Sequence, residues 1–194
     1  MARELVLAFE AAPPGEAEAP GMMSGMDEEG FRLLYERNAR PLRSYLSRMS
    51  GDRAAADDLL QETFLRFLRA RPPEMDGDGR RRYLFRIATN LLRDRFRRGK
   101  WRHEPLPELP SGGGSAEKSH LRLDLGRLLM RLKPRDRQLL WLAYVEGSSH
   151  DEIAEIAGLK SQSIRPMLFR ARQRLARLLR QKGLGSAIES KVRP

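Results

Sequence analysis

The sequence predicts an all-α fold: two small helical domains joined by a flexible linker, the C-terminal one a helix-turn-helix. Apolar residues recur with helical spacing in two blocks, no segment of useful length alternates as a strand would, and helix breakers crowd between the blocks. The blocks are residues 26–103 and 120–182. The linker between them, residues 104–119 (EPLPELPSGGGSAEKS), is too rich in Pro, Gly and Ser to bury a core. Residues 1–25 are expected to be disordered and residues 183–194 to form a tail.

The bulk composition favours a polyanionic partner. The 194 residues carry a net charge of +11, and only six of the 37 basic residues are lysine. Arginine can hold phosphates bidentately and read guanine edges, although a GC-rich genome also favours arginine codons. The absence of cysteine excludes disulfides and thiolate metal sites. No apolar run approaches the roughly 20 residues that span a bilayer, and the N-terminus lacks a secretory signal pattern. We therefore expect a cytoplasmic protein without membrane insertion.

The first block opens with a helix that contains Pro41, which is expected to kink or split it. Its apolar residues share one face. This pattern predicts that the face packs into the core and carries no functional site. They are Phe31, Leu34, Tyr35, Leu42, Tyr45, Leu46 and Met49.

The helix predicted at residues 54–70 has two contrasting faces. Its apolar residues follow i, i+3, i+4, i+7 spacing and predict a buried stripe. The opposite arc is acidic and contains one apolar residue, which suggests a protein interface, although an ordinary solvated face is an alternative. The arc holds Asp58, Gln61, Glu62, Leu65 and Arg69, and we call its first four residues the docking face.

The helix predicted at residues 80–102 has ten basic residues and one acidic residue. One side is apolar, and Tyr83 is expected to pack there rather than stack on a base. The other side gathers arginines with amide and hydroxyl groups, Thr89 among them, as expected of a surface that holds phosphates and reads bases. We call its proposed DNA contacts the arginine ridge; they are Arg82, Arg86, Asn90, Arg93, Asp94 and Arg97.

The second block has the dimensions of a helix-turn-helix. Ser149 and Glu152 have the spacing of a capping box at the start of a short helix. Gly158 suits the following turn, and Ser161 or Ser163 can cap the next helix. That helix has an apolar stripe opposite a row of arginines, as in a recognition helix that enters the major groove.

Together these segments resemble the extracytoplasmic-function branch of the bacterial sigma factor superfamily. ADDLLQETFLRFL (56–68) resembles the helix that grips the coiled coil of the largest polymerase subunit. YLFRIATNLLRDRFRR (83–98) resembles the helix that binds and opens the minus-ten promoter element. Residues 132–175 resemble the domain that reads the minus-thirty-five element. One helix-turn-helix is a weak signal, but three motifs in the family's order are a specific one.

The resemblance implies a transcription initiation factor that is not an enzyme and needs no cofactor. The docking face would contact core RNA polymerase, the arginine ridge would hold the melted strand, and the loop 71–80 would help hold a flipped-out base. The upstream flap of the polymerase and an anti-sigma factor would be further partners. The resemblance also implies a set of minus-thirty-five contacts, which we call the upstream set: Ser163, Arg165, Met167, Arg170 and Arg174.

The sequence departs from the family pattern at three positions. Pro166 and Met167 stand where polar or basic residues usually face DNA, and Tyr83 replaces the usual Trp before Leu84. The first two changes put base-specific readout by the second domain in question.

Two other functions were weighed. A helix-turn-helix regulator acting without polymerase would leave the docking face unexplained. A metal-dependent nuclease would need clustered ligands, whereas His103, His120 and His150 lack metal-ligand spacing.

Overall fold

A computed structural model of the chain describes residues 26–98 and 125–183, and every regular element in these two ranges is helical. The predicted all-α fold class is therefore confirmed. The linker 104–119, residues 1–25, His103, His120 and all but the first residue of the 183–194 tail lie outside the described residues.

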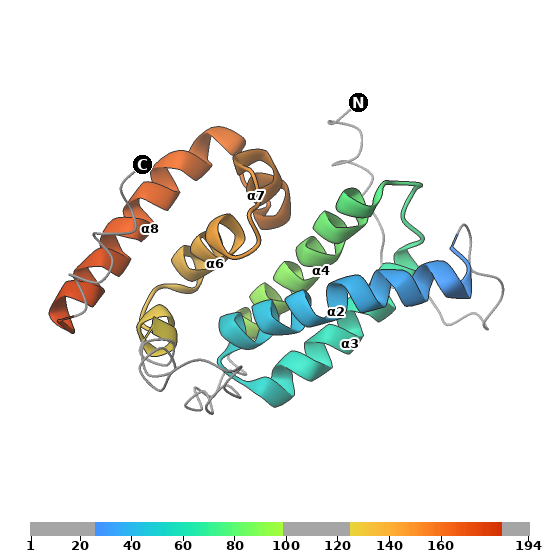
Figure 1. Ribbon diagram of the computed structural model, residues 1–194, viewed down its shortest axis with the longest axis horizontal. Coiled ribbons are helices and arrows are strands. Elements are labelled where there is room, and N and C mark those ends of the chain that lie inside the picture. The colour runs from blue at the N-terminus through green and yellow to red at the C-terminus, as the bar shows by residue number, and fades with distance from the viewer. Residues whose placement is uncertain (1–25, 99–124, 184–194) are drawn as a thin grey trace.

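The helices form two groups that follow one another along the chain (Figure 1). The first group contains α2 (Glu28–Ser50), α3 (Arg53–Ala70) and α4 (Gly77–Arg97). The second group contains α6 (Pro134–Tyr144), α7 (His150–Ala157) and α8 (Ser161–Gln181), preceded by helical residues 125–130. None of the helices in the described ranges combines the length and apolarity needed to cross a bilayer.

Helix α2 runs unbroken through Pro41, so of the two predicted effects of this proline, a kink or a split, the split does not occur. Proline here removes a single backbone donor, and the helix is held on both sides of it by buried residues such as Leu34 and Leu46. Its ends are well capped. Asp27 accepts a hydrogen bond from Gly30 N at 2.8 Å, and Gly51 adopts the left-handed conformation at the C-terminus.

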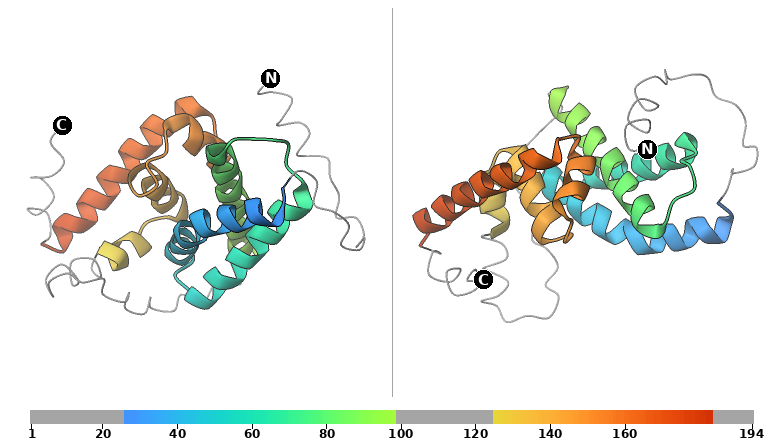
Figure 2. Two further views of the ribbon diagram at one scale, coloured as in Figure 1. Left: turned by 45° about the vertical axis from the view of Figure 1, so that its right-hand side comes forward. Right: turned by 90° about the horizontal axis from the view of Figure 1, so that it is seen from above.

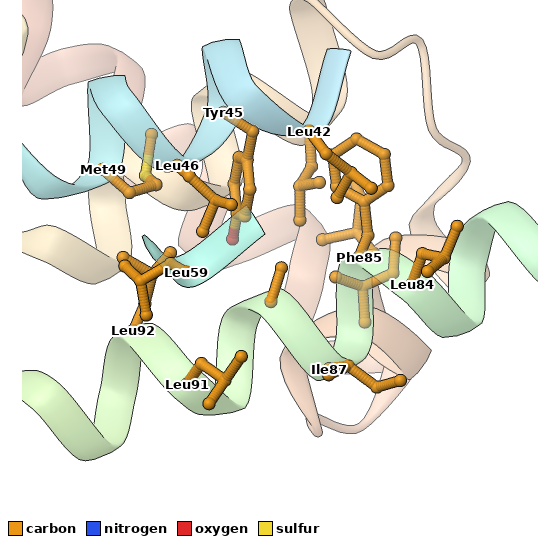
Figure 3. Close-up of a cluster of buried hydrophobic side chains, with 14 of the residues drawn as sticks. Leu42, Tyr45, Leu46, Met49, Leu59, Leu84, Phe85, Ile87, Leu91 and Leu92 are labelled. Atoms are coloured by element: carbon orange, nitrogen blue, oxygen red, sulfur yellow. The ribbon is translucent and has the colours of Figure 1, made fainter. Parts of the chain in front are cut away.

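The core of the first group lies between α2 and α4, with α3 closing it from one side. Figure 3 shows Leu42, Tyr45 and Leu46 of α2 pointing toward α4, which contributes Leu84 and Phe85 to the same cluster. All five side chains are buried, and the Tyr45 and Phe85 rings lie 5.2 Å apart. The predicted face of α2 is thus largely core. Tyr35, predicted to share it, is 45% exposed, although its ring lies 4.9 Å from that of Phe64.

The first helix of the helix-turn-helix begins as predicted, and the turn after it also forms as predicted. The Ser149–Glu152 capping box is present in both directions, and Gly158 has φ 61° at the end of α7. The cap of α8 differs from the prediction. Helix α8 begins at Ser161, so its N-cap residue is Lys160, whose side chain has no acceptor, and no side chain caps the helix. The Ser161 hydroxyl donates to the Asp151 carboxylate.

The two groups pack against each other, and their buried residues form one continuous cluster. Helix α7 lies along α4, whereas α8 runs out beyond the first group (Figures 1 and 2). The sequence suggested separate modules that share only a linker. In the structure the two groups are in contact. Side chains and backbone groups of α6 and α7 form hydrogen bonds and ion pairs with α2 and α4.

Candidate nucleic-acid interface

The docking face lies on the outer side of α3. Asp58, Gln61 and Leu65 are exposed, and Glu62 is half-buried in an ion pair with Arg66 at 2.7 Å. The opposite side of the helix is buried, as the apolar spacing predicted, through Ala56, Leu59, Leu60, Thr63, Phe64 and Phe67. The structure therefore gathers the four predicted residues on one accessible surface that carries both acidic and apolar groups.

Helix α4 presents its arginine ridge above a buried apolar side. Its N-terminus is capped by Asp76, which accepts a hydrogen bond from Gly79 N at 2.6 Å. Since α4 begins at Gly77, the last four residues of the predicted loop 71–80 belong to the helix. Thr89 is not on the ridge. It is buried, and its hydroxyl oxygen lies 2.8 Å from Tyr45 Oη.

The ridge residues have different surroundings. Asp94 and Arg97 form an ion pair at 3.1 Å near the end of the helix, and the Arg97 side chain is largely exposed. Arg86 and Asn90 are half-buried. Tyr83 packs edge-on against Phe67 at 5.9 Å, and burial raises the pKa of its hydroxyl. The predicted packing of Tyr83 against the core is confirmed.

Two ridge arginines bind the second helix group. Arg82 forms ion pairs at 3.3 Å with both Glu152 and Glu155 of α7. Arg93 Nη2 donates to the Ala157 carbonyl oxygen at 2.8 Å, at the C-terminal end of α7. The C-terminus of a helix carries partial negative charge, so all three partners attract a guanidinium.

A third arginine of α4, one position before Arg82, also reaches the second group. Arg81 pairs with the Glu146 carboxylate, whose side chain is only 6% exposed. Glu146 also accepts a hydrogen bond from Trp141 Nε1 at 2.8 Å. The Arg81 guanidinium lies 5.0 Å from the centre of the Phe85 ring. The free-energy cost of burying the Glu146 carboxylate is thus offset by one cation, Arg81, and one neutral hydrogen-bond donor, Trp141.

Helix α6 sends two polar side chains into the first group. Gln138 Nε2 donates to Tyr45 Oη and to Thr89 Oγ1, both at 3.0 Å. Arg137 Nη2 donates to the Met49 carbonyl oxygen at 2.9 Å, near the C-terminal end of α2. Burial raises the pKa of Tyr45 to about 12 and lowers the pKa of Arg137 to about 10. Both groups keep their usual protonation state near neutral pH.

The upstream set lies on α8 between Ser163 and Arg174, and its members differ in their contacts. Arg165 and Arg170 are exposed, and Ser163 is half-buried. Met167 packs partly against the core. Arg174 Nη1 contacts both carboxylate oxygens of Asp136 in α6, at 2.9 and 2.7 Å. Pro166 lies within α8, which continues through it.

No group of three or more His, Asp or Glu side chains in residues 26–98 and 125–183 is placed to hold a metal ion. The described histidine, His150, is an exposed residue at the start of α7.

Comparisons with known proteins match both helix groups. Residues 34–102 match the model of the Sigma-70 region 2 family, and residues 122–175 match that of Sigma-70, region 4. The RNA polymerase sigma factor CarQ of Myxococcus xanthus is 31% identical over 157 residues, which cover 78% of this chain and 90% of CarQ. The chain belongs to the extracytoplasmic-function sigma factors.

Another relative in this family is the ECF RNA polymerase sigma factor SigE of Mycolicibacterium smegmatis, 37% identical over 141 residues. The match covers 66% of this chain and 53% of SigE, so the chain spans about half the length of that relative. Among solved structures, the sigma factor RpoE in complex with the anti-sigma factor NepR from Bartonella quintana has a TM-score of 0.67 at 23% identity, covering 78% of this chain and 98% of RpoE. CnrH in complex with the cytosolic domain of CnrY has a TM-score of 0.61 at 26% identity, covering 82% and 92%.

Several polar contacts of this sigma factor were not foreseen from its sequence. The sequence predicts no role for Arg81, Arg137, Gln138 or Glu146, and their partners in the other group lie 49 to 93 residues away in the chain. Local spacing carries no signal for such pairs.

Two members of the upstream set are expected to respond differently to truncation. Arg174→Ala should lower the free energy of unfolding by about 1–3 kcal/mol, because it leaves the 6%-exposed Asp136 carboxylate without its cation. Arg170→Ala should change stability by less than about 0.5 kcal/mol, because Arg170 is exposed. Urea unfolding followed by circular dichroism measures both. Equal losses in the two variants would contradict the structural role of Arg174.

Proposed function

We propose that this chain binds core RNA polymerase, recognises promoter DNA and helps to open it at the start of transcription. The observation that carries the proposal is the division of charge among three helices. The docking face on α3 is acidic and partly apolar, whereas the exposed faces of α4 and α8 are rich in arginine. A single polyanionic ligand would bind the arginine-rich faces but would be repelled by the acidic docking face. A protein partner for α3 and nucleic acid for α4 and α8 account for all three.

Each surface has a proposed partner. Asp58, Gln61, Glu62 and Leu65 contact the coiled coil of the largest polymerase subunit. The arginine ridge on α4 holds the displaced strand of the minus-ten element, where cationic side chains replace the counterions of the phosphates. Residues 26–103 form the domain that carries both surfaces.

Residues 120–182 form the domain that binds the minus-thirty-five element and the upstream flap of the polymerase. Arg165 and Arg170 are exposed on α8 and are the best placed of the upstream set to reach DNA. Met167 contacts the core and Arg174 holds Asp136, which leaves these two less free to contact bases. Fewer base contacts by this domain would make the minus-ten element the main source of specificity.

The chain would act in the cytoplasm and catalyse no reaction itself, since the polymerase supplies the chemistry. An anti-sigma factor is a further proposed partner. The support is that RpoE and CnrH, which share the fold, were each solved in complex with another protein, NepR and the cytosolic domain of CnrY respectively.

The function can be tested by transcription in vitro. Purified chain and core polymerase would be incubated with fragmented genomic DNA, and the 5′ ends of the transcripts would be mapped. We expect start sites that require the chain and share two upstream sequence elements, with core polymerase alone as the control. No chain-dependent start site would refute the proposal. Tight binding of the chain alone to a palindromic duplex would instead favour the regulator that acts without polymerase.

A further inference from the structure

Two exposed basic residues stand at the N-terminal end of α6. Lys133 directly precedes this helix and Arg135 is its second residue. Within residues 26–98 and 125–183, no ion pair or hydrogen bond occupies either side chain. We propose that Lys133 and Arg135 bind backbone phosphates of the upstream duplex, beside the groove that α8 enters. This inference rests on the proposed function, because it requires α8 to lie in the major groove.

Helix α6 crosses α8, and its two ends meet different sides of that helix. Near the N-terminus of α6, the Asp136 carboxylate contacts Arg174 Nη1 at 2.7 Å. At its C-terminus, Tyr144 Oη accepts a hydrogen bond from Arg172 Nη1 at 3.3 Å. Because Arg172 and Arg174 are two residues apart in one helix, their side chains point about 160° apart around its axis. The N-terminal end of α6 therefore lies on the side of α8 that carries Arg174.

That side of α8 also carries the exposed Arg170, since residues four apart share a helix face. The Cα atoms of Arg135 and Asp136 are about 3.8 Å apart, so the Asp136–Arg174 pair holds Arg135 close to this face. Asp136 is the one acidic residue of α6, and it is buried against Arg174. The exposed charges at this end of α6 are thus positive and continue the positive face of α8.

The width of the major groove decides what these cations can reach. The groove is about 12 Å wide, and a helix with its side chains is about 10–12 Å across, so α8 would fill it. Helices that pack together have axes about 8–10 Å apart. Helix α6, which packs on α8, would then lie over the edge of the groove, where the sugar–phosphate backbone runs. Its exposed cations meet phosphates there rather than base edges.

Phosphate binding would also offset the weak base-reading capacity of α8. Pro166 offers no side-chain donor, and Met167 packs partly against the core. Lysine binds a phosphate as a point charge and arginine as a planar fork, and neither contact depends on the base sequence. The second domain would therefore hold upstream DNA largely through its backbone, with Arg174 positioning α6 for this contact.

The salt dependence of duplex binding by the full chain tests the proposal. The probe is a fluorescein-labelled, mixed-sequence duplex of about 20 base pairs, because phosphate contacts do not require a particular sequence. Anisotropy titrations at several KCl concentrations give the slope of log affinity against log salt. Lys133→Gln with Arg135→Gln removes both cations. Arg40→Gln with Arg69→Gln, at exposed positions of α2 and α3, is the control of equal charge.

We expect the magnitude of the slope to fall by about 1.8 in the Lys133→Gln, Arg135→Gln variant, since each lost phosphate contact removes about 0.9. The factor by which this variant binds more weakly than the wild type should then shrink about twelvefold between about 50 and 200 mM KCl. The control should change the slope by less than about 0.5. Lys133→Arg with Arg135→Lys should keep the wild-type slope, because both charges remain. All variants should match the wild type in circular dichroism, since the changed side chains are exposed.

Three results would overturn the proposal. The first is a wild-type slope in the Lys133→Gln, Arg135→Gln variant, or no binding of the duplex by the wild-type chain. The second is an equal loss of slope in the control, which would mean a general effect of net charge. The third is a lower slope in the charge-retaining variant, which would mean that these residues act by something other than charge. Chain-dependent start sites in the transcription assay combined with any of these results would leave the proposed function standing and remove this inference alone.

Discussion

Replacing Asp58 by arginine is expected to abolish binding to core RNA polymerase while leaving the fold intact. Asp58 is exposed on α3 and lies on the outer side of the helix, opposite its buried stripe. The change replaces an attraction by a like-charge repulsion inside an interface, which costs about 2 kcal/mol or more, a factor of roughly 30 or more in Kd. Anisotropy of the dye-labelled chain titrated with core polymerase measures the loss.

Glu36→Arg is the matched control for this experiment. Glu36 is an exposed acidic residue on α2, paired with Arg32 at 2.8 Å, and it lies outside the docking face. The control makes the same change in net charge and should leave polymerase affinity within about twofold of the wild type, since exposed ion pairs contribute little. Equal affinity of Asp58→Arg and wild type would remove the docking face from its proposed role.

Phe85→Ala is expected to destabilise the first helix group severely. The Phe85 ring is 1% exposed, contacts Tyr45 across the α2–α4 core and lies beneath Arg81. Removing a buried phenyl ring costs about 3–5 kcal/mol through lost burial and the remaining cavity, a large fraction of the stability of a domain of this size. Urea unfolding should show a lower midpoint, and the cation–π contact of Arg81 should be lost with the ring.

Phe169→Ala serves as the comparison for the ring deletion. Phe169 lies on α8 and is 52% exposed, so its removal should change the free energy of unfolding by no more than about 0.5 kcal/mol. A loss at Phe85 no larger than the loss at Phe169 would contradict the described packing of α2 on α4.

Features set by neighbouring residues could be predicted from the sequence. The Ser149–Glu152 capping box and the left-handed Gly158 depend on contacts within four residues, and both form as expected. The buried stripe of α3 follows from helical spacing alone. The fold class, the turn of the helix-turn-helix and the accessibility of the docking face all derive from such short-range patterns.

Features set by distant residues could not be predicted. The helical spacing put Thr89 on the same side of the helix as the arginine ridge. Instead, Thr89 is buried, and its hydroxyl hydrogen-bonds with Tyr45 and Gln138 of other helices. Ser161 or Ser163 was expected to cap α8, yet the helix begins at Ser161 with Lys160 as its N-cap residue, and the Ser161 hydroxyl donates to Asp151 of α7. Periodicity gives the direction of a side chain but not the element that it meets there. The packing of α7 on the ridge was missed for the same reason.

The pairing of α7 with α4 also has a consequence during synthesis of the chain. Arg82 and Arg93 precede their partners by 64 to 73 positions, so α2, α3 and α4 leave the ribosome before Glu152, Glu155 and Ala157 have been added. At roughly 5–20 residues per second, translation from the end of α4 to the end of α7 takes roughly 3–12 s. For those seconds the nascent chain presents an uncovered row of arginines to the RNA-rich surroundings of the ribosome.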